Sequence, residues 1–126
     1  MNKNRTSSLI NSSVIIIEQM EMEIFTDALE NRIEIILEPI QTDPNRQNIF
    51  SALCLTDFLK NTLTSNIVHS MWKIEALSMI MRLKLDLIYA LKADIDRDAD
   101  NKEMYLAWAR IRKYELRVAI TESEEV

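Results

Sequence analysis

The chain has 126 residues, of which 48% are hydrophobic and 28% are charged, and its formal net charge is −5. A chain of this length and composition is expected to fold as one domain, and its hydrophobic content excludes an intrinsically disordered protein. No apolar run in the sequence reaches the roughly 18 uncharged residues of a membrane-spanning helix, and the negative net charge disfavours non-specific binding to phosphate backbones.

Glycine is absent from the chain, and only two prolines occur. The tight hairpin turns of β-rich folds depend on glycine for positive φ angles, so its absence favours helices. The sequence therefore predicts an all-α protein with a four-helix bundle architecture. We expect a single domain over 1–126, with loose ends at 1–10 and 122–126.

The first predicted helix is long and spans about 11–38. Pro39 is expected to end it, because proline lacks an amide donor and disfavours helical geometry in the residue before it. Asp43 is the expected N-cap of the second helix, with Pro44 at the first helical position. This second helix is predicted over about 44–62.

The third predicted helix spans about 66–95 and the fourth about 100–121. Asp100 and Glu103 form the pattern of a capping box at the start of the fourth helix. The aspartate-rich segment 94–100 is therefore expected to be the loop that separates them.

The third predicted helix carries two apolar stripes on nearly opposite sides. The first stripe is typical of the core-facing side of a bundle helix and comprises Ile67, Met71, Ile74, Leu77, Met81, Leu85 and Ile88. The second stripe comprises Trp72, Ala76, Met79, Leu83, Leu87 and Ala90. One apolar side is enough for a bundle core, so the second stripe is expected to form a subunit or partner interface through Trp72, Ala76, Met79, Leu83 and Leu87. The alternative is that this helix lies centrally within the fold and uses both sides for its own core.

The start of the first helix is out of phase with its remainder. Ile16 and Met20 fall on the acidic side of the helix, whereas Glu18 and Glu21 fall on the apolar side. A straight helix cannot bury both sets against one core. We therefore expect either a kink near Met22 or a first segment that packs on a second subunit or partner.

Charged residues of opposite sign gather on the first and fourth predicted helices. The acidic face consists of Glu23, Asp27, Glu30, Glu34 and Glu38, and the basic line consists of Arg110, Lys113 and Arg117. Such faces can orient helix pairing or the approach of a partner, and the simpler alternative is two solvated surfaces.

The residue types that carry catalysis are sparse. Cys54 is the only cysteine and His69 the only histidine, and they are far apart in the sequence. Because Leu53 and Leu55 flank Cys54, a packed thiol is expected, in a reducing, cytoplasmic setting. We expect no catalytic residue, no metal and no cofactor.

Two metal-binding patterns are incomplete. The acidic residues Glu18, Glu21, Glu30, Glu34 and Glu38 are similar to the first half-motif of all-α magnesium-dependent nucleotide pyrophosphatases. The Glu-x-x-Asp pair that would complete the motif does not follow. The segment from Asp94 imitates the opening of a calcium loop, but Ala99 and Tyr105 replace the required glycine and glutamate.

The function expected from the sequence is a non-enzymatic helical protein–protein interaction module, such as an adaptor, a small chaperone or a regulator of a larger assembly. It is expected to act as a homo-oligomer that also binds another protein, without contact to a membrane. One alternative is a nucleic-acid-binding accessory protein that uses the basic line of the fourth helix. A further alternative is the metal-dependent nucleotide pyrophosphatase.

Overall fold

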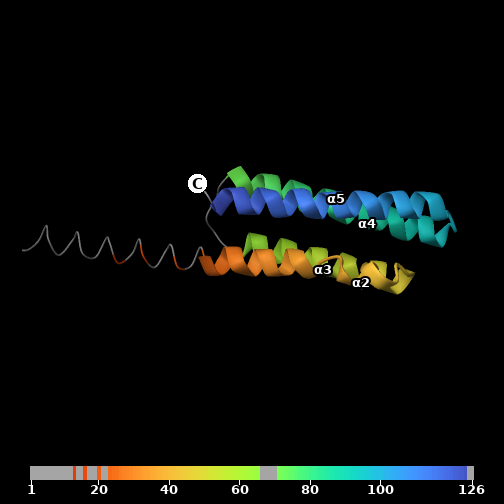
Figure 1. The fold of residues 1–126 in the computed structure, drawn as a ribbon, viewed down its shortest axis with the longest axis horizontal. Coiled ribbons are helices and arrows are strands. Elements are labelled where there is room, and N and C mark those ends of the chain that lie inside the picture. Colours follow the sequence, from red (N-terminus) through yellow and green to blue (C-terminus); the bar gives the residue numbers. More distant parts are fainter. Residues whose placement is uncertain (1–12, 14–15, 17–19, 21–22, 66–70, 125–126) are drawn as a thin grey trace, which may run out of the picture.

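The structure is a computed structural model that describes residues 13, 16, 20, 23–65 and 71–124. The first helix is described continuously over 23–35, and it is followed by α3 (Arg46–Thr64), α4 (Met71–Ile95) and α5 (Ala99–Glu124). Successive helices run in opposite directions and pack side by side as an antiparallel bundle (Figure 1). The prediction of an all-α bundle is thus confirmed for the described residues. None of these helices combines the length and apolar character needed to cross a membrane.

The first helix ends earlier than predicted. Residues 36 and 37 form a turn, and the short helix α2 (Glu38–Thr42) follows with Pro39 in its first turn. Proline is tolerated in a first turn because the amides there have no acceptor within the helix, so Pro39 opens α2 rather than ending the long helix. The predicted kink near Met22 lies outside the described residues.

Helix α3 begins at Arg46, later than the predicted start at Pro44. Asn45 is its N-cap, and the Asn45 side-chain oxygen accepts a hydrogen bond of 2.8 Å from the amide of Asn48. The Asp43 carboxylate instead accepts a hydrogen bond of 3.0 Å from the Asn45 side chain. The prediction that Asp43 caps this helix is therefore wrong, because the asparagine two residues later satisfies the free amide.

Residues 96–98 connect α4 to α5 by a Schellman motif. The Arg97 amide donates to the Asp94 carbonyl at 3.2 Å, and the Asp98 amide donates to the Ala93 carbonyl at 2.8 Å. Arg97 has a φ of 59°, in the left-handed region that glycine usually occupies at this position. The loop is thus shorter than the predicted segment 94–100.

Asp98 caps the start of α5. Its carboxylate accepts hydrogen bonds from the Asn101 amide at 3.1 Å and from the Asn101 side chain at 2.6 Å. The predicted capping box of Asp100 and Glu103 is therefore wrong, and α5 extends to Glu124, beyond the predicted end.

Replacing Arg97 with glycine is expected to raise the free energy of unfolding by about 0.5 to 1 kcal/mol. Glycine removes the steric cost of the left-handed conformation, although it also increases the entropy of the unfolded chain. Thermal denaturation of the Arg97→Gly and Arg97→Ala variants measures the effect, because alanine keeps the same steric cost. A glycine variant no more stable than the alanine variant would contradict the prediction.

Asp94 links three helices at this end of the bundle. Its carboxylate lies on α4 and accepts a hydrogen bond of 2.8 Å from Lys102 of α5 and one of 3.0 Å from Arg46 of α3. The hydrogen bonds from Lys102 and Arg46 lower the pKa of Asp94 below its ordinary value. Asp94 thus joins the α4–α5 turn to the start of α3.

The Asp94→Asn variant is expected to lose about 1 kcal/mol of unfolding free energy at neutral pH. Because the folded state lowers the pKa of Asp94, its stabilising effect is present above the carboxyl pKa of the unfolded chain, roughly pH 4, and is lost as the pH falls through the folded-state pKa. Denaturation curves between neutral pH and about pH 3 should therefore converge for wild type and variant. Asp96→Asn, which removes an exposed carboxylate, is the matched control. A constant difference at all pH values would contradict this account.

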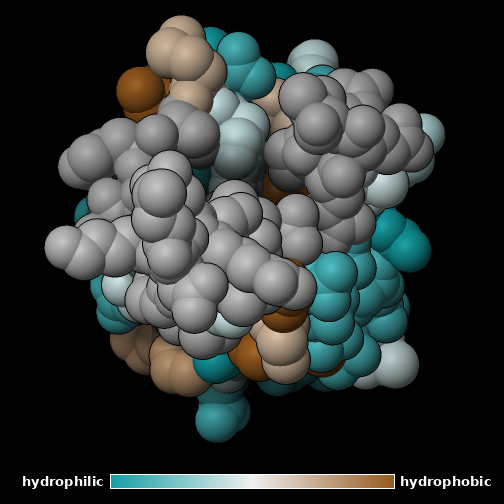
Figure 2. All heavy atoms as spheres, turned by 90° about the vertical axis from the view of Figure 1, so that its left-hand side faces the viewer, coloured by the Kyte–Doolittle hydropathy of each residue, from teal (hydrophilic) through white to brown (hydrophobic). Residues whose placement is uncertain are grey.

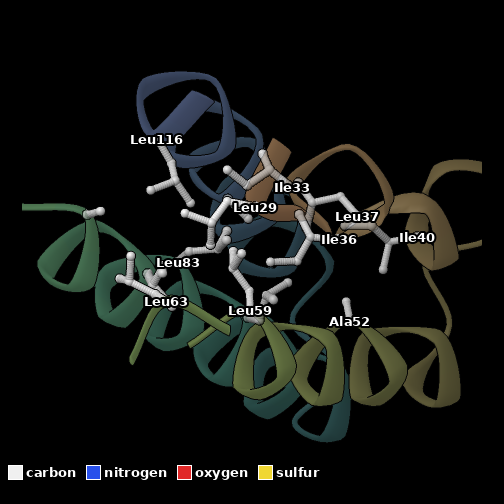
Figure 3. Packing of buried hydrophobic residues seen from close by; sticks show 14 of the residues in the cluster. Leu29, Ile33, Ile36, Leu37, Ile40, Ala52, Leu59, Leu63, Leu83 and Leu116 are labelled. Carbon is white, nitrogen blue, oxygen red and sulfur yellow. The ribbon is translucent and has the colours of Figure 1, made fainter. Parts of the chain in front are cut away.

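The hydrophobic core is one cluster to which every described helix contributes. Figure 3 shows side chains of the first helix and α2, from Leu29 to Ile40, pointing between the other helices. Leu59 and Leu63 of α3, Leu83 of α4 and Leu116 of α5 meet them from the remaining sides.

Candidate interaction surface

The stripe of α4 expected to form an interface lies against the core of the single chain. Ala76, Leu83 and Leu87 are fully buried, and Trp72 and Met79 are half-buried where they pack against the core. Trp72 also contacts Phe25 of the first helix, with ring centroids 6.3 Å apart. The structure thus corrects the expectation that these residues form an interface. They pack against the core of the single chain, which is the alternative that the sequence left open.

The stripe expected to face the core is instead exposed. Five of its large residues form what we call the outer stripe of α4: Met71, Ile74, Met81, Leu85 and Ile88. Exposure reaches 73% for Met71 and 64% for Ile74, and is 46% for Leu85. Leu77 is half-buried against the core, and Ile67 lies outside the described residues. The outer stripe is therefore an apolar surface that nothing in the described part of the chain covers.

Small residues explain why the two stripes of α4 are used in this way. Ala76, Ala90 and Ala93 are buried, whereas no alanine falls on the outer side of α4. Close approach of helices gains packing contacts that bulkier residues would prevent. The alanines were the signal in the sequence that could have identified the core side.

The cations near the outer stripe are Arg82, Lys84 and Lys92. Arg82 and Lys92 are exposed and make no ion pair with any described residue, while Lys84 contacts Asp57 of α3 at 2.8 Å. At 100° per residue Arg82 falls on the flank of α4 next to α5, together with Glu75 and Asp86, whereas Lys84 falls on the flank next to α3 and Lys92 follows the outer stripe at its C-terminal end. Charges of both signs therefore flank the outer stripe.

Apolar residues on α5 are exposed as well. Met104, Trp108 and Ile111 are each a little under half exposed. Tyr89 of α4 and Tyr105 of α5 have ring centroids 5.2 Å apart, which sets the register of the two helices and places Trp108 near the level of Ile88. The apolar surface of α4 is therefore adjacent to a second apolar strip on α5.

A charged pair lies between α4 and α5. Asp86 Oδ2 and Arg112 Nε are 3.7 Å apart, and both atoms are buried without a hydrogen bond. Burial raises the pKa of Asp86, and the positive charge of Arg112 opposes this rise. The Arg112 guanidinium also lies 5.3 Å from the ring centroid of Trp108.

The acidic face of the first helix and the basic line of α5 meet at one residue. Glu34 contacts Arg117 at 2.7 Å, and the Lys113 ammonium donates to the Glu34 carbonyl at 3.0 Å. These contacts hold the two helices together, as expected for faces that orient helix pairing. The remaining members Glu23, Asp27, Glu30 and Arg110 make no ion pair with any described residue, and Glu38 lies in α2.

The prediction of a packed thiol at Cys54 is wrong. Its thiol is exposed on α3, because the residue falls on the outward side of the helix, between the exposed Phe50 and Phe58. His69 lies outside the described residues.

The expected absence of a metal site stays a prediction. Within the described residues no three or more His, Cys, Asp or Glu side chains come together to hold a metal ion, while Glu18 and Glu21 lie outside them. In the segment that imitates a calcium loop, Asp94 is bound by Lys102 and Arg46, and Asp98 caps α5.

Figure 2 looks along the bundle from the left-hand end of Figure 1. Brown and tan hydrophobic residues reach the surface at the upper left and lower edge of this view, whereas teal hydrophilic residues cover the lower part of its right-hand side. Together these features define the class of the protein as an all-α antiparallel bundle with an apolar stripe that the described residues leave uncovered. Comparison with protein-family models, with curated proteins and with solved structures finds no match to this chain.

Proposed function

We propose that the chain is a non-enzymatic helical interaction module that acts as a homo-oligomer and binds a further protein. The observation that supports this proposal is the outer stripe of α4. Soluble bundle helices generally bury one apolar side, and large exposed apolar patches mark association surfaces. In this module the stripe supplies the contact area, and Met71 and Met81 give it side chains that adapt to different partners.

A nucleic-acid-binding function depends on the basic line of α5, and the contacts give it little support. Lys113 and Arg117 are engaged with Glu34, which leaves Arg110 as the member of the line without an ion pair among the described residues. Phosphate recognition needs several cations that are free to replace counterions.

The experiment is light scattering on a size-exclusion column for the wild type, Leu85→Glu and Tyr114→Glu, with circular dichroism to confirm that all three are helical. The wild type should have a mass above the 14.7 kDa of one chain. Leu85→Glu should reduce the mass to that of the monomer, because a carboxylate at the centre of a contact is desolvated without a partner. Tyr114→Glu introduces the same charge at an exposed residue of α5 and should leave the mass unchanged.

A wild type with the mass of a monomer would contradict the proposal that the chain acts as a homo-oligomer. A Leu85→Glu variant that stays assembled would contradict the role of the outer stripe.

A further inference from the structure

The outer side of α4 repeats its residues at alternating steps of three and four. Together with the exposed Ser78, the outer stripe occupies six such positions in a row, which are Met71, Ile74, Ser78, Met81, Leu85 and Ile88. Lys92 follows at the next step and ends the apolar run. A helix that lies on a globular core has a wider apolar side, whereas strict alternation of three and four is typical of a coiled-coil seam. The spacing therefore fits a second helix that lies along this side of α4.

Within the described part of one chain, the outer side of α4 has no helix to pair with. Helix α4 packs against α3 and α5 on its other sides. The first helix contacts α3 through Arg32, whose guanidinium lies 4.0 Å from the ring centroid of Phe58. It contacts α5 through the ion pair of Glu34 and Arg117, and it therefore lies diagonally across the bundle from α4 (Figure 1). A helix that covers the outer stripe has to come from another molecule.

The charges beside the outer stripe are complementary to those of a second copy. Glu75 and Arg82 lie seven residues apart on the flank of α4 next to α5, and both are exposed and make no ion pair with any described residue. Asp86, further round the same flank, lies beside Arg112 of α5. When two helices pair antiparallel about a two-fold axis, each flank meets the same flank of the other copy. Glu75 of each copy then faces Arg82 of the other.

The same arrangement pairs the whole apolar run with itself. It forms three kinds of layer between the copies, each present twice: Met71 against Ile88, Ile74 against Leu85, and Ser78 against Met81. Sliding one copy by seven residues sets Arg82 against Arg82 in one direction and Glu75 against Glu75 in the other. Like charges in contact across an interface are unfavourable, so the flank charges favour the register in which the run pairs with itself.

A parallel pair gains no such ion pairs. In an in-register parallel coiled coil, each flank meets the opposite flank of the other copy, so that Arg82 faces Leu77. Lys84 lies on that opposite flank and is already paired with Asp57 of α3. The flank charges therefore favour the antiparallel orientation.

We propose that two copies of the chain pair through the outer stripe of α4 as an antiparallel, two-fold symmetric coiled coil, with two ion pairs between Glu75 and Arg82 at its edge. This inference rests on the proposed function and specifies its interface. A two-fold contact uses the same surface of both copies, so it closes as a dimer and adds no further subunit.

The area of this contact is that of a reversible dimer. A large aliphatic side chain loses roughly 100 Å² of accessible surface when it is fully buried. The five residues of the outer stripe are between 39% and 73% exposed, so two copies would bury on the order of 500 Å² through them. With a similar area from the flanks, the total is about 1,000 Å², at the low end for specific interfaces. The dimer is therefore expected to dissociate on dilution.

The main test reverses the two charges separately and together. Glu75→Arg makes both positions basic and Arg82→Glu makes both acidic, so each single variant should dimerise at least about tenfold more weakly than the wild type. The double variant exchanges the two charges, so it should dimerise within about threefold of the wild type. An equimolar mixture of the two single variants should also dimerise, because a basic copy then meets an acidic one. Sedimentation equilibrium over a range of concentrations measures the dissociation constants.

The matched controls are Glu103→Arg and Arg110→Glu, which change the net charge equally at exposed residues of α5 outside the stripe. Both should dimerise like the wild type. The inference is overturned if a single reversal at Glu75 or Arg82 leaves the dimer unchanged, if the double variant does not recover, or if the wild type has a mass above that of two chains. If Leu85→Glu separates the subunits while these reversals have no effect, the proposed function stands and only this interface fails.

A cross-linking test decides the orientation independently of the charges. In a Cys54→Ser background, one chain carries Ile74→Cys and another carries Leu85→Cys, two positions that share a layer in the antiparallel pair. Under mild oxidation, their mixture should form disulfide-linked dimers of the two different chains. Each variant alone should form few, because the two copies of either residue then lie about 16 Å apart along the helix axis. Efficient cross-linking of either variant with itself, or the absence of a mixed disulfide, would overturn the inference.

Discussion

Replacing Leu83 with alanine is expected to lower the free energy of unfolding by about 3 kcal/mol, whereas Leu85→Ala should change it by less than about 0.5 kcal/mol. The two leucines are two residues apart on α4 but lie on opposite sides of it. Leu83 is fully buried among the other helices, and Leu85 is 46% exposed. Truncating a buried side chain leaves a cavity that the surrounding side chains fill only in part, so contacts as well as burial are lost.

Chemical denaturation followed by circular dichroism measures both variants, in dilute protein so that association adds little to stability. The comparison tests the assignment of the two sides of α4 directly. Equal losses for the two variants, or a larger loss for Leu85→Ala, would show that the outer stripe belongs to the core.

Replacing Arg112 with methionine is expected to lower the free energy of unfolding by about 2 kcal/mol at neutral pH. The change leaves the Asp86 carboxylate largely buried without the cation that lies 3.7 Å away in the wild type. Methionine keeps much of the apolar stem of arginine, so the loss is mainly electrostatic. The double variant Asp86→Leu with Arg112→Met should recover most of the lost stability, because no buried charge remains.

The pH dependence of the Arg112→Met variant identifies the cause. Burial already raises the pKa of Asp86, and the loss of Arg112 removes the opposing effect, so the folded-state pKa rises further. A carboxyl group whose pKa is higher in the folded than in the unfolded state destabilises the fold increasingly as the pH rises through this interval. The deficit should therefore shrink as the pH is lowered from 7 to about 4. A deficit that is the same at both pH values would assign it to packing instead.

The helical class of the fold was predictable because the sequence lacks glycine and repeats its apolar residues at helical spacing. The ends of the helices were harder to predict. Asp43 and Asn45 are both good capping residues, and only the path of the chain decides which one meets a free amide. Arg97 takes a conformation that its residue type disfavours, because the turn between α4 and α5 requires it.

A surplus apolar stripe on α4 was predicted, but it was assigned to the wrong side of the helix. Two apolar stripes on one helix indicate that one of them is surplus to the usual core-facing side. Hydropathy cannot distinguish them, since Leu83 and Leu85 are the same residue type. The size of the neighbouring residues can, because alanines such as Ala76 and Ala90 accompany the side against which other helices pack closely.

The order of the helices also has a consequence for how the chain folds. Among the described helices, α3 packs against α4 and α4 against α5 as neighbours in the sequence, whereas the pairing of the first helix with α5 joins Glu34 to Lys113, 79 residues apart. Contacts between consecutive helices form fast because little loop entropy is lost, and distant contacts form later. We therefore expect the contact between the first helix and α5 to form after the contacts between consecutive helices. By the same reasoning, this contact should be among the earliest to separate when the folded protein opens locally.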